Sequence, residues 1–157
     1  GLEWFDENEV DKEKIKGFWD WLLDNQHEKE GEIFAGFGHW INHSQEVLDY
    51  AWIAERMSKS LEISKGALDW KHGLESQFVN LAYTSPENTL SILQSFLLEG
   101  DKLNPNRDAW FRIDETLKEA LRVLYDVQSI KPDVARLINK LIEVGGNRFW
   151  TLKDLLD

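Results

Sequence analysis

The chain of 157 residues contains no cysteine, which excludes disulfide bonds and thiolate zinc sites. The lack of cysteine also fits a reducing compartment, so we expect the protein in the cytoplasm. No apolar run approaches the roughly 20 residues that a membrane-spanning helix needs. Nucleophile and phosphate-binding motifs are missing too, because neither Gly-x-Ser-x-Gly nor Gly-x-x-x-x-Gly-Lys occurs. We therefore expect no catalytic residue and no bound cofactor.

Basic side chains are scarce relative to acidic ones. The chain has 18 lysines and arginines against 29 aspartates and glutamates, which gives a net charge of −11. Binding to nucleic-acid phosphates or to an anionic membrane surface depends on clustered cations. The charge balance therefore predicts neither nucleic acid nor membrane as a partner, and leaves protein as the expected one.

Apolar residues recur with helical spacing through most of the chain. Candidate caps, glycines and prolines separate the periodic segments. No segment alternates apolar and polar residues for long enough to predict a strand, so the predicted fold class is all-α. The predicted helices cover residues 11–25, 32–42, 45–61, 67–83, 86–99, 110–125, 131–144 and 149–156.

Residues 85–125 form the segment around which the rest of the chain is organised. Ser85 suits a helix N-cap and Pro86 a first helical residue. The helix that follows is apolar on two sides, which predicts that it lies between neighbouring helices. A second helix then returns and completes an αα-hairpin. The apolar positions are Leu90, Leu93 and Leu97 on one side of the first helix, Ile92 and Phe96 on the other, and Trp110, Ile113, Leu117, Ala120, Leu121 and Leu124 on the second helix.

Helix starts recur at a regular spacing. Ser44, Ser85 and Lys131 open successive helical pairs about 40–46 residues apart, the range of HEAT and armadillo repeats. The spacing predicts a short solenoid of stacked αα-hairpins, with an irregular helical bundle as the alternative. We predict an acidic, irregular segment at residues 1–10 and a single helical domain at 11–157. Because the chain begins with Gly1 and not with Met, we expect it to be a fragment of a longer protein.

Eight tryptophans are the most unusual feature of the composition. Five of them fall on predicted apolar helix faces and are expected in the core: Trp19, Trp40, Trp52, Trp70 and Trp110. The other three are less constrained, and an exposed tryptophan often marks an interface. The predicted protein-contact residues are Trp4, Trp21 and Trp150.

His39 and His43 are four residues apart, which places two imidazoles on one helix face, as in helical metal sites. No glutamate follows His39 to act as a general base. These residues support one alternative function, a small metal-dependent hydrolase on a helical bundle. The leading expectation is that the histidines are ordinary polar residues and that no metal is bound.

A set of packing residues from Phe18 onward forms a pattern. It comprises Phe18-Trp19-x-Trp21, Phe34-Ala35-Gly36-Phe37-Gly38-His39-Trp40, Leu81-Ala82 with Ser85-Pro86, Leu97-Leu98-Glu99-Gly100-Asp101, and Leu137-Ile138-Asn139-Lys140-Leu141-Ile142 with Gly146, Phe149 and Leu152 to Leu156. This pattern resembles the HEAT-like helical segment at the C-terminal end of large bacterial proteins. Those proteins carry a sirtuin-like or P-loop NTPase effector domain upstream, and several belong to anti-phage defence systems. The resemblance implies that any NAD or nucleotide chemistry lies outside this chain.

The sequence therefore predicts a non-enzymatic helical-repeat module for protein interaction or sensing in a larger bacterial defence or regulatory protein. The expected partner is either an effector domain of the same protein or an external protein. A structural spacer between other domains is a further alternative to the hydrolase.

Overall fold

The computed structural model describes residues 10–25, 50–66, 74–98, 110 and 115–156. Helices account for 91% of these residues, and none of them lies in a strand. The all-α prediction is therefore confirmed for the described part of the chain. Its elements are α1 (Val10–Asn25), α4 (Tyr50–Ser64), α5 (Leu74–Thr84), α6 (Pro86–Leu98), α8 (Glu115–Tyr125), α9 (Lys131–Gly145) and the 3-10 helix η4 (Gly146–Leu156).

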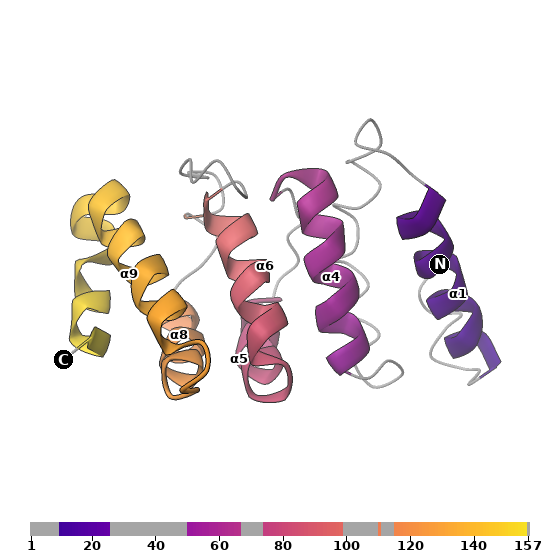
Figure 1. Cartoon of the computed structure of the whole chain (residues 1–157), viewed down its shortest axis with the longest axis horizontal. Coiled ribbons are helices and arrows are strands. Elements are labelled where there is room, and N and C mark those ends of the chain that lie inside the picture. The colour runs from indigo at the N-terminus through magenta and orange to yellow at the C-terminus, as the bar shows by residue number, and fades with distance from the viewer. Residues whose placement is uncertain (1–9, 26–49, 67–73, 99–109, 111–114, 157) are drawn as a thin grey trace.

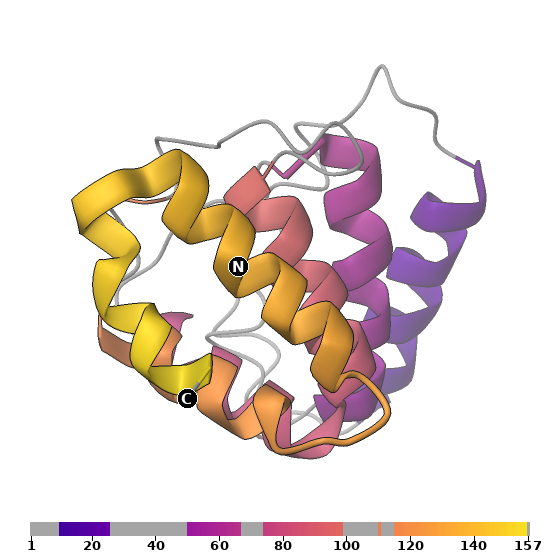
Figure 2. The ribbon, with the colours of Figure 1, turned by 60° about the vertical axis from the view of Figure 1, so that its left-hand side comes forward.

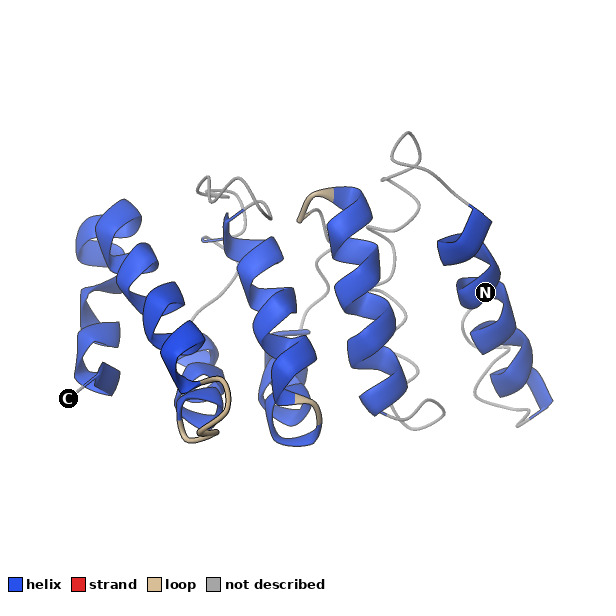
Figure 3. Ribbon diagram, in the orientation of Figure 1, coloured by secondary structure: helices blue, strands red, loops and turns tan. Residues whose placement is uncertain are grey.

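The helices lie in two layers. Helices α4, α6 and α9 stand side by side in one layer, with α5 behind α6 and α8 behind α9 (Figure 1). The 3-10 helix η4 folds back from the end of α9 towards α8 (Figure 2). The turn after α4 is at one edge of the array, and the turns before α6 and α9 are at the opposite edge (Figure 3). Consequently α4, α6 and α9 run in the same direction. The assignment of these layers to HEAT or armadillo repeats remains a prediction.

Two helices of the front layer begin where their prolines predict. Helix α6 begins at Pro86, and the carbonyl of Ser85 accepts hydrogen bonds from the Thr89 amide at 2.9 Å and the Thr89 hydroxyl at 2.7 Å. Helix α9 begins one residue before its own proline, and the Val134 amide donates to the Ile130 carbonyl at 2.9 Å. Proline suits a first turn because its missing N–H would have no intrahelical partner there. These two starts therefore determine where α6 and α9 begin in the front layer.

Helix α4 ends later than predicted. The sequence predicts its end at Leu61, whereas the helix continues to Ser64. It closes with Lys65 and Gly66 at φ angles of 56° and 87°, and the Gly66 amide donates to the Leu61 carbonyl at 2.9 Å. This left-handed turn captures an orphan carbonyl of the last helical turn. The extra turn also places Ile63 against the core.

Buried side chains follow most of the predicted stripes. Helix α6 is buried on both sides, as its two stripes predict, and α8 and α9 each bury one face. Helical spacing also predicts Phe18 on the apolar face of the helix at residues 11–25 and Ala51 on the inner face of the helix at 45–61. Both predictions are wrong, because Phe18 is 54% exposed and Ala51 is also exposed. Phe18 and Trp19 are about 100° apart around the helix axis, and α1 is rotated so that Trp19 is buried, at 2% exposed, while Phe18 is exposed. The buried predicted positions are Trp19, Leu22, Phe78, Leu81, Ala82, Leu90, Ile92, Leu93, Phe96, Leu97, Trp110, Leu117, Ala120, Leu121, Leu124, Val134, Leu137, Ile138 and Leu141.

Candidate functional site

The structure does not bring the predicted contact tryptophans together. Trp21 on α1 is 54% exposed and Trp150 on η4 is 57% exposed. Their two elements lie at opposite ends of the array (Figure 1), so these side chains cannot form one site. Trp150 is covered in part by Lys153, whose Nζ lies 4.8 Å from the ring centroid. Trp4 lies outside the described residues.

Of the five tryptophans predicted in the core, Trp19 and Trp110 are buried. Trp52 is only half-buried, and two cations lie near its ring. The Nζ atom of Lys16 and the Cζ atom of Arg56 are each 5.7 Å from the ring centroid of Trp52. Predictions for the remaining two, Trp40 and Trp70, fall outside the described residues.

The proposed metal ligands His39 and His43 also lie outside the described residues, so the hydrolase alternative stays a prediction. Within the residues that the structure places, no group of three or more His, Cys, Asp or Glu side chains is arranged to hold a metal ion. No helix among them combines the length and the apolar character needed to cross a membrane.

Arg56 joins the first two described helices. Its guanidinium is ion-paired with Asp20 of α1 and with Glu55 of α4, the latter at 2.7 Å. Burial disfavours the charge on Arg56, but the two carboxylates outweigh burial and raise its pKa. The hydrogen bond from Arg56, together with its positive charge, lowers the pKa of Glu55 below the ordinary value. Because Arg56 of α4 pairs with a carboxylate of α1 as well as one of its own helix, we interpret this cluster as a link between the two helices.

A pocket opens between α6 and α9 and is the strongest candidate site among the residues that the structure describes. Its volume is about 390 Å³, within the range of pockets that bind ligands. Among the other described helices, α4 packs against α6 in the front layer and α5 packs against α8 in the back layer. The side chains that line the pocket are Gln94 and Leu98 from α6 and Asp133, Arg136, Leu137, Asn139, Lys140 and Glu143 from α9.

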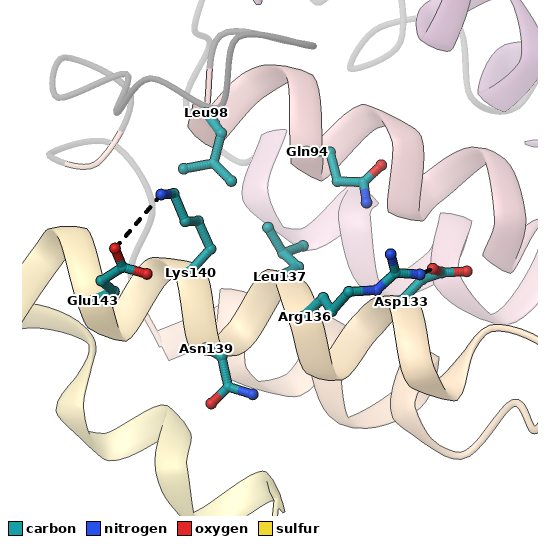
Figure 4. A pocket seen from close by; sticks show the side chains of 8 residues that line it. All are labelled: Gln94, Leu98, Asp133, Arg136, Leu137, Asn139, Lys140 and Glu143. Atoms are coloured by element: carbon teal, nitrogen blue, oxygen red, sulfur yellow. Dashed lines mark hydrogen bonds and ion pairs between the residues drawn. The ribbon is translucent and has the colours of Figure 1, made fainter.

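The floor of the pocket is apolar. Leu98 and Leu137 are both buried, at 1% and 3% exposed, although they come from different helices. In Figure 4 Gln94 extends from α6 towards α9 beside these leucines. A ligand would therefore meet an apolar surface at the bottom of the pocket and an amide group at its wall.

The rim of the pocket is charged. Arg136 is ion-paired with Asp133, and Lys140 Nζ lies 3.7 Å from Glu143 Oε1 (Figure 4). The four charges sum to zero, and both carboxylates already have cationic partners. The apolar floor can accept an apolar side chain of a ligand, and the charged rim can contact polar groups beside that side chain. We interpret the pocket as a candidate binding site.

The sequence could not have indicated this pocket. Asp133, Arg136, Lys140 and Glu143 recur at helical spacing beside the apolar face of α9, the pattern of an ordinary solvated helix face. These residues line a pocket only because α9 is separated from α6 in the fold. Helix α6 begins 45 residues earlier in the sequence, so no local pattern reports this separation.

Comparison with known proteins adds no relative to this description. No protein family, curated protein or solved structure matches the chain at a significant level, so its resemblance to the helical segment of bacterial defence proteins remains a prediction.

Proposed function

We propose that this chain is a non-enzymatic helical-repeat module that binds a protein partner through the pocket between α6 and α9. One observation carries the proposal: in the described part of the front layer α4 packs against α6, whereas a pocket of about 390 Å³ lies between α6 and α9. Two packed layers of helices supply a rigid frame, and an array of this kind presents an extended surface. Within a larger bacterial protein of the defence type, the module would report partner binding to an effector domain.

The chemistry of the pocket supports protein as the ligand. An apolar floor of leucines surrounded by polar groups is the usual anatomy of a protein-contact surface. Leu98 and Leu137 provide the floor, and the ion pairs of Asp133 and Lys140 provide the rim. The net charge of −11 makes phosphate-rich ligands unfavourable partners.

Photo-cross-linking tests the proposal directly. A photoreactive phenylalanine analogue replaces Gln94 in the pocket or, in a second protein, Arg122 on the exposed face of α8. Both proteins are irradiated in cells that express the chain, and the cross-linked peptides are identified by mass spectrometry. We expect position 94 to label one segment of one partner protein and position 122 not to label it.

A matched pair of substitutions establishes that the labelling depends on the pocket. Lys140→Trp fills the pocket from α9, whereas Lys118→Trp adds the same bulk on α8. The two lysines are similarly exposed, at 30% and 32%, and each lies 3.7 Å from one carboxylate. Lys140→Trp should abolish cross-linking from position 94, and Lys118→Trp should preserve it. Equal labelling with both variants, or no protein labelled from position 94, would refute the proposal.

A further inference from the structure

We propose that the partner segment on the α6–α9 pocket is an amphipathic helix with a specific order of charges. It carries one apolar side chain between two acidic ones, with basic residues at both ends. The inference rests on the proposed function and names the partner of that same pocket. It follows from the backbone of the pocket walls, from the order of charges on the rim and from the net charge of the chain.

The walls of the pocket favour a helix over an extended strand. Both walls are α-helices, whose backbone N–H and C=O groups are bonded within each helix except at the helix ends. An extended segment would enter with its own backbone groups needing partners, and helical walls have no strand edge that could pair with them along its length. A helix satisfies its backbone internally and can insert an apolar side chain over Leu98 and Leu137.

The rim determines where the partner's charges lie. Along about 15 Å of α9, two cations in the centre, Arg136 and Lys140, are flanked by Asp133 and Glu143. A complementary helix presents acids to the central cations and bases to the outer acids. The existing pairs do not prevent this exchange, because exposed ion pairs between residues three apart contribute little. The apolar side chain then lies between the two acids, above the leucine floor.

The charge of the chain argues against a second copy and against a simple anion. Two copies, each with a net charge of −11, repel one another. A phosphate group would be attracted by Arg136 but repelled by the adjacent Asp133. A peptide with equal numbers of basic and acidic residues avoids the net repulsion and matches each charge along the rim. This complementarity selects the basic-ended helix as the occupant.

Charge inversion on both sides of the interface tests the inference. The first probe is a synthetic helical peptide with basic ends and a central acid–leucine–acid face, and the second has its acids and bases exchanged. The variant Asp133→Arg/Arg136→Asp/Lys140→Glu/Glu143→Lys inverts the rim but keeps both ion pairs and the net charge. A control, Glu119→Arg/Arg122→Glu, inverts a pair on α8 that spans 2.7 Å. Binding is measured by fluorescence anisotropy, and circular dichroism verifies that each variant is folded.

We expect the wild-type chain and the α8 control to bind the first peptide at least about tenfold more tightly than the second. The variant with the inverted rim should show the opposite preference. A third peptide, the first one with a proline at a central outward-facing position, should lose binding because it cannot form the helix.

The same preference in the wild-type and inverted proteins would overturn the inference, as would undiminished binding of the proline peptide. If neither charged peptide binds, the helical partner is also ruled out. In that case the proposed function is decided separately by the cross-links from position 94, which do not depend on the choice of peptide.

Discussion

Trp110 connects the end of α6 to the junction of α9 and η4. Its Nε1 donates a hydrogen bond to the Leu97 carbonyl at 3.0 Å, and its own carbonyl accepts one from Arg148. Its ring meets the ring of Phe149 edge-on, with centroids 5.1 Å apart at 87°. Leu97 lies in the last turn of α6, where carbonyls lack an intrahelical partner. The indole therefore satisfies a helix end and packs the core at the same time.

Trp110→Phe should lower the free energy of unfolding by about 1–3 kcal/mol, because the ring contact survives while the Leu97 carbonyl loses its donor. Trp110→Ala removes the packing as well and should cost about 3–5 kcal/mol. Urea unfolding followed by circular dichroism measures both values. A phenylalanine variant as stable as the wild type would show that the indole hydrogen bond contributes nothing.

Two glycines should respond in opposite ways to the same added methyl group. A Cβ on Gly145 would overlap the ring of Phe149, which is held against Trp110 and cannot move freely. Gly145→Ala should therefore destabilise the fold by about 1–3 kcal/mol. Gly17 lies in the exposed interior of α1 with no atom near its Cβ position, so Gly17→Ala should stabilise by about 0.5–1 kcal/mol. Thermal melts compare the two variants, and effects of the same sign would contradict the packing described at Gly145.

At the scale of elements, α1 is attached to the array through α4. Trp19 and Leu22 supply the apolar contact, and Arg56 of α4 adds the ion pair to Asp20. Arg56 also lies over Trp52, so one guanidinium contacts two carboxylates and an aromatic ring. A side chain with this many partners orients α1 on α4.

The Arg56 cluster predicts a pH dependence of stability. The pKa of Glu55 is lowered in the folded state by its hydrogen bond from Arg56 and by the charge of Arg56. Glu55 therefore adds stability above its unfolded value of 4.5, and that contribution is lost as pH falls through the lower folded value. Urea melts at about pH 7 and about pH 3 measure the free energy of unfolding on both sides of this pKa. We expect this free energy to decrease less on acidification in Arg56→Gln than in the wild type. Identical pH profiles would exclude this contribution.

At the scale of the whole molecule, the described part of the chain consists of helices and the turns that join them, without a strand. The sequence also predicts helices at residues 32–42 and 67–73, which lie outside that part. Far-UV circular dichroism should therefore report about 65–75% helix, well above the usual content of a globular protein. A helix content under about 45% would contradict the all-α fold.

Much of this architecture could be predicted from local signals. Proline marks the starts of α6 and α9, and the two apolar stripes of α6 correctly predict a helix buried on both sides. The side of α1 that faces the core is harder to predict. Phe18 and Trp19 are both apolar, and periodicity alone does not decide which of these neighbours is buried. The final segment was predicted as a short helix but is a 3-10 helix over Gly146–Leu156, a distinction that hydrophobic spacing does not make.

The candidate site could be predicted only in part. Trp21 and Trp150 are exposed, as expected of contact residues, but they belong to opposite ends of the array. The pocket depends on the distance between two helices that are remote in sequence, and no local pattern encodes that distance. In the sequence, the charged residues of α9 have the pattern of an ordinary solvated helix face. Their role in the pocket follows only from the position of α6 in the fold.

The burial of α6 on both sides has a consequence for amide hydrogen exchange. Helix α6 has neighbours in its own layer and in the layer behind, so its amides can reach solvent only when much of the fold opens. Helix α1 packs against α4 at one end of the described array and exposes Phe18 and Trp21, so we expect its amides to exchange through smaller opening motions. Among the helices that the structure describes, protection against deuterium should therefore be greatest in α6 and lowest in α1, which makes α6 the last of them to lose its structure.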